Sequence, residues 1–140
     1  MQNRKIAIIG QDKKSIRDLQ EILSGGGYIP IPVSDSILAV DTVIQKKPDV
    51  ILVDLRMSRK NTFELTGAIN RVFETRQIPI IAVSNSFNEE YGFLLDLCGI
   101  KKCIKKPFLP LDVIWAIENE IEPNNQWGME NRLEGVEVLA

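Results

Sequence analysis

The hydrophobic positions of this chain form short, uninterrupted apolar runs that alternate with segments of helical period. The clearest run is Val50 to Val53, where aliphatic residues follow one another with no polar face between them. Such a run is typical of a strand buried on both faces, as in a parallel sheet covered by helices. The run ends at Asp54. Ligands of open α/β sheets gather beyond the carboxyl ends of the strands, so Asp54 is either a functional residue or an Asp that only ends the strand.

The same pattern predicts five strands, each followed by a helix. The predicted strands are 6–9, 28–33, 50–54, 78–83 and 102–104, and the last helix runs over about 110–121. Pro30 and Pro32 confine the second strand to a sheet edge, because proline cannot donate to a ladder. The third helix, ending near Thr75, is expected to bury an inner face made of Phe63, Leu65, Ile69, Val72 and Phe73. Strict alternation with short connections predicts a parallel sheet with helices on both faces.

Length and composition narrow the function classes. The 140 residues suit one ordinary domain, and the net charge of -2 argues against a nucleic-acid surface made by bulk charge. No apolar run approaches the length of a membrane span and no signal-peptide core is present, so we expect a cytoplasmic protein without a membrane partner. The chain has no His, and its two cysteines, Cys98 and Cys103, lack metal-ligand spacing. Most hydrolase and zinc chemistry is thereby excluded.

Distinctive polar groups follow four of the five predicted strands. They are Gly10-Gln11-Asp12, Asp54, Ser84 and Lys106. In a parallel sheet all four lie at one edge. A carboxylate flanked by a hydroxyl and an ammonium suits phosphoryl transfer, because Ser and Lys can bind phosphoryl oxygens while the carboxylate is the covalent acceptor. Such catalysis is mostly positioning and charge neutralisation, usually helped by magnesium. The sequence therefore predicts an acyl-phosphate site.

Over about residues 4–121 the chain resembles the receiver domain of two-component response regulators. The matching positions are Gly27-Tyr28, Asp35, Ala39, Pro48-Asp49, Val53-Asp54, Met57, Phe63-Glu64-Leu65, Pro79-Ile80-Ile81, Ser84, Gly99 and Lys106-Pro107-Phe108. The resemblance implies a flavodoxin-like (βα)5 fold with a five-stranded parallel sheet in the order 2-1-3-4-5. It implies that Asp54 is the phosphoacceptor, Ser84 the switch hydroxyl and Lys106 the cation that contacts the phosphate, with a cis bond before Pro107. It further implies a phosphoacceptor switch, not an enzyme, whose partner is a sensor histidine kinase or a phosphotransfer protein.

The chain departs from this family at the metal-binding positions. Receivers end their first strand on two adjacent carboxylates, and a count without gaps puts Gly10 and Gln11 there. A slip of one residue would bring Asp12 into the second acidic position, and a helix N-cap is the equally weighted alternative for Asp12. The resemblance implies metal ligands from Asp12, Gln11, Asp54 and the backbone carbonyl of Arg56. Since magnesium prefers carboxylate oxygens, we expect weak binding.

Other departures keep a second function open. Cys103 stands where receivers commonly carry an aromatic switch, and Lys101, Lys102, Lys105 and Lys106 form a basic cluster that we expect to be mostly solvated. Residues 1–121 are assigned to the receiver domain and 122–140 to a linker or tail without a confident period. The alternative function is a degenerate receiver that binds or dimerises without phosphorylation. With or without phosphorylation, we expect the output, including a possible homodimer, to use a face made by the fourth helix, the fifth strand and the fifth helix. A flavodoxin-like enzyme is disfavoured, because the chain has no nucleophile with a base.

Overall fold

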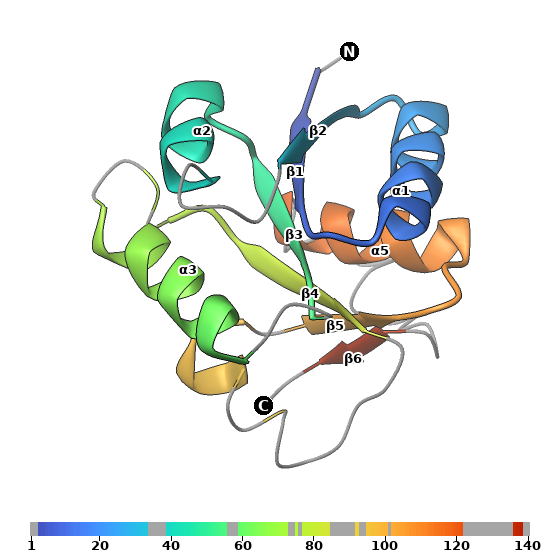
Figure 1. Cartoon of the computed structure of the whole chain (residues 1–140). Coiled ribbons are helices and arrows are strands. Elements are labelled where there is room, and N and C mark those ends of the chain that lie inside the picture. Colours follow the sequence, from blue (N-terminus) through green and yellow to red (C-terminus); the bar gives the residue numbers. More distant parts are fainter. Residues whose placement is uncertain are drawn as a thin grey trace.

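Six strands form a single sheet in the order β2-β1-β3-β4-β5-β6 (Figure 1). The computed structural model describes residues 3–33, 39–55, 59–72, 75, 77–84, 92, 95–100, 102–121 and 136–138. The strands are β1 (Lys5–Ile9), β2 (Ile29–Val33), β3 (Val50–Asp54), β4 (Ile80–Ser84), β5 (Lys102–Lys105) and β6 (Val136–Val138). The first five are parallel, which confirms the predicted order 2-1-3-4-5, and β6 pairs antiparallel with β5. The sixth strand was not predicted.

Helices cover both faces of the sheet. They are α1 (Lys13–Gly25), α2 (Ala39–Lys46), α3 (Arg59–Arg71) and α5 (Pro110–Ile121). In Figure 1, α2 and α3 lie on one side of the strands, and α1 and α5 on the other. Alternate residues of β3 enter two separate buried clusters: Ile51 and Val53 join the cluster on the side of α2 and α3, whereas Val50 and Leu52 join that of α1 and α5. The burial of β3 on both faces is therefore confirmed.

The edge position of β2 follows from its prolines. The amide of Ile29 donates to the carbonyl of Arg4 at 2.8 Å, so this residue faces β1. Because backbone groups of alternate residues point to opposite sides of a strand, Pro30 and Pro32 face away from β1, where a missing amide costs nothing. The predicted edge strand is confirmed.

Two predictions about the helices are corrected by the structure, and others fall outside it. Helix α3 ends at Arg71 rather than near Thr75, and Phe63, expected inside, is 40% exposed, whereas Leu65 and Ile69 are buried. Ser34-Asp35-Ser36, which the sequence offers as the cap of the second helix, lie outside the described residues. The sequence also predicts a fourth helix over 88–97, of which residues 88–91, 93 and 94 lie outside the described part. Among the described helices, none combines the length and apolar character needed to cross a membrane.

Candidate functional site

Asp54 and Lys106 meet at the carboxyl edge of the sheet. Asp54 is the last residue of β3 and is 2% exposed, and Lys106 directly follows β5. The Lys106 Nζ lies 3.1 Å from both carboxylate oxygens of Asp54. The amide of Lys106 also donates to the carbonyl of Ser84 at 2.9 Å, which fixes the end of β5 against β4. The ammonium therefore forms a two-pronged, charge-assisted contact with a buried carboxylate.

Asp12 contributes a second carboxylate to the same site. It is the N-cap of α1: its Oδ1 accepts from the Lys14 amide at 3.2 Å, and its Oδ2 accepts from the Ser15 hydroxyl at 2.7 Å. The same Oδ2 lies 3.7 Å from Lys106 Nζ. The N-cap role is thus confirmed, and it does not exclude a role in the site, because the capping carboxylate also faces the cation that holds Asp54.

Gly10 is a residue of the site that sequence reasoning missed. A Cβ at this position would lie 2.7 Å from the Cβ of Asp54, which is closer than two non-bonded carbon atoms approach each other. Gly10 comes directly after β1, which pairs with β3 up to Ile9 and Val53. The absence of a side chain at Gly10 is therefore what lets Asp54 occupy its place. A glycine at the end of a fully buried strand was the signal that could have indicated a close approach of this kind.

Ser84, Gln11 and Arg56 are the other residues that were predicted for the site. Ser84 ends β4 and is buried, one register position beyond the Val83 that pairs with Asp54. Gln11 is exposed at the carboxyl end of β1. Arg56, whose carbonyl was a predicted metal ligand, lies outside the described residues. The Lys106-Pro107 peptide bond is cis, as the resemblance implied.

The donor set can be tested for magnesium. In the described part of the chain, no group of three or more His, Cys, Asp or Glu side chains is close enough to hold a metal ion. Two carboxylates, Asp12 and Asp54, nevertheless converge on one cation, the ammonium of Lys106. Among the described residues, two carboxylates and one ammonium thus meet at this site. Hard oxygen donors fit magnesium, which usually keeps several waters, so two carboxylates can hold it weakly.

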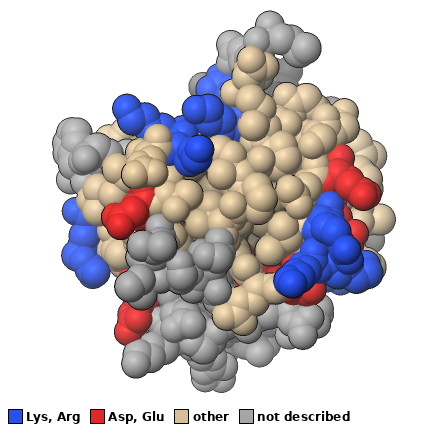
Figure 2. Space-filling model, turned by 45° about the horizontal axis from the view of Figure 1, so that its top comes forward, with Lys and Arg blue, Asp and Glu red and all other residues tan. Residues whose placement is uncertain are grey.

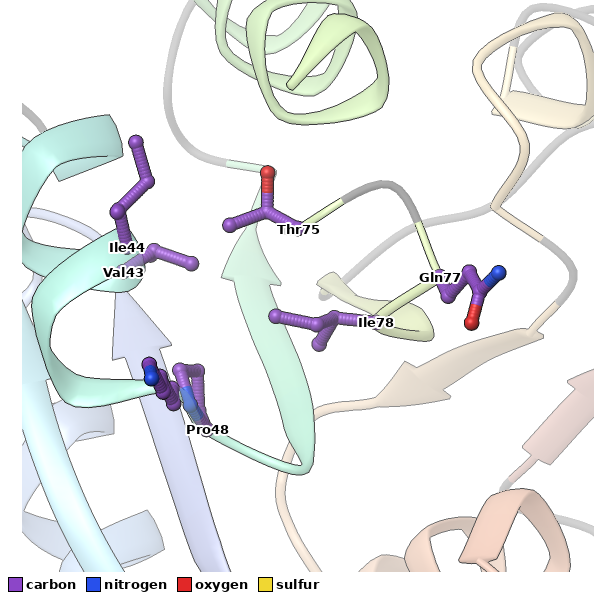
Figure 3. Close-up of a pocket in the computed structure, with 7 residues that line it drawn as sticks. Val43, Ile44, Pro48, Thr75, Gln77 and Ile78 are labelled. Atoms are coloured by element: carbon purple, nitrogen blue, oxygen red, sulfur yellow. The ribbon is translucent and has the colours of Figure 1, made fainter. Parts of the chain in front are cut away.

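A separate pocket of about 390 Å³ lies at the opposite ends of the strands from Asp54 (Figure 3). Its described lining residues are Val43, Ile44, Lys47, Pro48, Thr75, Gln77 and Ile78, none of which carries a carboxylate. The Thr75 hydroxyl donates to the carbonyl of Ile69 at 2.8 Å. Pro48 precedes β3 and Ile78 precedes β4, so this pocket is at the amino ends of the strands, away from Asp54.

Comparison with known protein families decides the identity of the fold. The family described as the response regulator receiver domain matches residues 6–118, which is most of the chain. The chain belongs to this family. Receiver domains are signalling switches of two-component systems, so the observed carboxylate and lysine lie in a phosphosignalling fold. The resemblance found in the sequence is confirmed at the level of the family.

Two relatives extend this comparison. The receiver is 30% identical over 138 residues to hybrid signal transduction histidine kinase C of Dictyostelium discoideum, covering 92% of this chain and 11% of that protein. It is 25% identical over 81 residues to the polar-differentiation response regulator DivK of Brucella anthropi, covering 58% of this chain and 66% of that protein. The chain therefore spans less than two thirds of either relative.

Solved structures share the fold. A response regulator from Desulfuromonas acetoxidans superimposes with a TM-score of 0.77 at 20% identity, covering 86% of this chain and 98% of that one. The receiver domain of a sensor histidine kinase from Pseudomonas aeruginosa, solved with a magnesium ion coordinated in its active-site cleft, gives a TM-score of 0.76 at 22% identity. It covers 86% of this chain and 98% of its own. At these identities the two structures support the fold alone.

Proposed function

We propose that this receiver is a phosphoacceptor switch of a cytoplasmic phosphorelay, with Asp54 as the residue that takes the phosphoryl group. The observation that supports this most is the placement of Lys106 Nζ at 3.1 Å from both oxygens of Asp54. A buried carboxylate so paired is held in a fixed orientation at the edge where ligands of such sheets bind. Ser84, at the end of the adjacent strand β4, supplies the hydroxyl that the proposed site needs beside the carboxylate and the ammonium.

The proposed reaction transfers a phosphoryl group from a phosphohistidine of the donor. An oxygen of Asp54 forms a bond to phosphorus while the bond between phosphorus and the imidazole nitrogen breaks, and the imidazole then takes a proton from water. Lys106 neutralises charge on the phosphoryl oxygens, and the Ser84 hydroxyl donates to one of them. The product is an acyl phosphate on Asp54, with about -1.5 to -2 charge opposite Lys106.

Magnesium is proposed as a weakly bound cofactor. Asp12 and Asp54 would hold it, with Gln11 and the backbone carbonyl of Arg56 as the further candidates. When bound, the ion supplies charge neutralisation to the phosphoryl oxygens. Lys106 and the metal would share the same two carboxylates, so this chain relies on its own ammonium for part of that neutralisation.

The partner is proposed to be a sensor histidine kinase or a phosphotransfer protein that docks beside the site. Leu109 and Leu111, just beyond the Lys106-Pro107 bond, are 60% and 66% exposed. Leu111 lines an apolar groove of about 420 Å³ between α1 and α5, together with Glu21, Ile22, Gly25, Gly26, Pro110 and Ile114. Exposed apolar surface of this kind is typical of a protein contact. Figure 2 shows charged side chains of both signs toward the rim of the face it draws, around a broad central area of uncharged residues.

A matched pair of leucines tests this docking surface. We expect Leu111→Asp to slow phosphoryl transfer from a phosphohistidine donor protein and to leave labelling by acetyl phosphate unchanged. Leu97→Asp, which alters an equally exposed leucine near the end of the fourth helix, is the control and should change neither rate. Equal effects of the two substitutions would place the donor elsewhere.

Magnesium-dependent binding of beryllium fluoride, which mimics the phosphoryl group, tests the proposed function itself. Calorimetry should give one site per chain, abolished by Asp54→Asn. If the wild-type chain does not bind the mimic and acquires no adduct from acetyl phosphate, the alternative holds. The chain is then a degenerate receiver that binds or dimerises in a fixed state, through the face of the fourth helix, β5 and α5. Tyr91 and Phe93, which we expect on that face, lie outside the described residues.

A further inference from the structure

The outer edge of β5 is covered by a strand from the C-terminal segment. In the antiparallel pairing, Val136 lies opposite Ile104, Glu137 opposite Cys103, and Val138 opposite Lys102. Val136 is 0% exposed and belongs to the same buried cluster as Ile104 and Trp115. An uncovered β5 would present unpaired amides and carbonyls along an apolar edge. Strand β6 therefore satisfies the β5 edge and adds one residue to the core.

The corner where part of α5 lies next to β5 encloses one ion pair and, among the described residues, two polar atoms without a hydrogen-bond partner. Lys102 is 4% exposed, with its Nζ 2.8 Å from a Glu120 oxygen and 5.4 Å from the centre of the Trp115 ring. Trp115 Nε1 and Asn119 Oδ1 are buried without a hydrogen-bond partner. Each of these atoms would gain hydrogen bonds to water if the corner opened. The burial of Val136 favours the docked strand, whereas the two unpartnered atoms favour an open, hydrated corner.

Strand β5 joins this corner to the phosphoryl site. It begins at Lys102, under β6, and the residue after its end is Lys106, which holds Asp54. The pair Ile104 and Val136 stands two residues before Lys106. The position of β5 is thus fixed on its outer edge by β6 and at its carboxyl end by contacts of Lys106 with Asp54 and Ser84.

We propose that the β5 edge is a strand-docking surface whose occupant is this chain's own β6, and that docking of β6 and ligand binding at Asp54 favour each other. This inference rests on the proposed function. A docked β6 restricts β5 and so holds Lys106 in place before a ligand arrives. A ligand that contacts Lys106 also restricts the motion of β5. Docking of β6 then costs less conformational entropy, because β5 is already restricted. Because binding couplings are reciprocal, the two effects have equal size.

Hydrogen exchange of the full-length chain measures the coupling from the strand's side. We expect amides of 136–138 to exchange faster than those of β3, and to slow by about fivefold or more when magnesium and beryllium fluoride are added. Val136→Thr, which keeps the side-chain shape, should speed exchange at 136–138 and weaken binding of the mimic, by no more than the factor by which the mimic slows that exchange. Val40→Thr alters a partly buried valine of the opposite cluster and should do neither.

A ligand-free measurement separates this inference from the proposed function. Lys106→Met removes the contact with Asp54, and we expect it to speed exchange at 136–138. Lys14→Met, which removes an exposed ion pair with Asp18, should leave that exchange unchanged. If the wild type fails to bind the mimic but Lys106→Met loosens β6, the proposed function fails and the link through β5 stands. If exchange at 136–138 responds neither to the ligand nor to Lys106→Met, or matches that of β3, β6 is only a structural strand.

Discussion

Two lysines, four positions apart in the sequence, each pair with a carboxylate, but one is partly buried and the other is buried. Lys106 lies at the carboxyl edge of the sheet, 3.1 Å from both oxygens of Asp54. Lys102 lies inside the corner of α5, β5 and β6, 2.8 Å from an oxygen of Glu120. The Lys106 side chain is 11% exposed, whereas that of Lys102 is 4% exposed and faces a tryptophan ring.

The difference lies in the number of carboxylate partners and in exposure. Lys106 lies near two carboxylates, since Asp12 Oδ2 is also 3.7 Å from its Nζ, and its side chain is 11% exposed. Lys102 has one carboxylate partner among the described residues, Glu120, and is covered on its strand side by β6. The same pairing of lysine with carboxylate is therefore partly open to solvent at the edge of the sheet, and enclosed within the corner.

The largest difference between the two pairs should appear in covalent labelling. Asp54→Asn should abolish the phosphoryl adduct completely, because an amide lacks the anionic oxygen that attacks phosphorus. Intact-protein mass spectrometry after incubation with acetyl phosphate and magnesium measures it. Glu120→Gln is the matched control in the other pair and should keep the adduct. An adduct that persists in the Asp54 variant would mean that another residue is the acceptor.

The fit between Gly10 and Asp54 gives the next largest effect. Gly10→Ala should displace Asp54 from Lys106, destabilise the fold by about 1–3 kcal/mol and weaken binding of beryllium fluoride strongly. Gly25→Ala is the control, because a Cβ there meets nothing within 4 Å. Urea unfolding and calorimetry report the two quantities. Unchanged binding in a folded Gly10→Ala chain would show that the site tolerates the shift and that the close approach is incidental.

The enclosed pair should show an asymmetry between its two partners. Removing Glu120 leaves a buried ammonium unmatched, so Glu120→Gln should cost about 2 kcal/mol of unfolding free energy. Lys102→Met replaces the ammonium by an apolar group and should be nearly neutral. Both free energies come from urea unfolding, with Lys14→Met as an exposed control expected to change stability by less than about 0.5 kcal/mol. Equal costs for both substitutions would argue that the corner is hydrated.

The smallest expected effect concerns magnesium affinity and the number of carboxylates at the site. Gln11→Asp adds a carboxylate at the exposed end of β1, and we expect magnesium affinity to rise by about threefold to tenfold, as for a partly screened charge. Titration calorimetry with magnesium measures the change, and Gln20→Asp, on the body of α1, is the control. Failure of Gln11→Asp to raise the affinity would mean that Asp12 already supplies the needed charge, or that the site holds no metal.

Much of the fold was predictable because its signals are local. The apolar run before Asp54, the prolines of β2 and the capping Asp12 each indicate a local structure through backbone and burial preferences that act over a few residues. The placement of Asp54, Ser84 and Lys106 at one edge followed from strand direction alone. Their roles in phosphoryl transfer stay predictions.

What only the tertiary structure decided depends on contacts between distant segments. The lysine cluster of residues 101–106 was expected to be mostly solvated, but Lys102 is buried because α5 offers Glu120 and Trp115 and because β6 returns to cover the edge. Strand β6 was not predicted, since three residues carry no detectable period and become a strand only by pairing with β5. Likewise, the sequence shows Gly10 only as a position where receivers carry an acidic residue. Its close approach to Asp54 depends on the pairing of β1 with β3. Sequence patterns therefore determined which residues reach the edge of the sheet. Packing between distant segments decided which lysines and carboxylates contact each other.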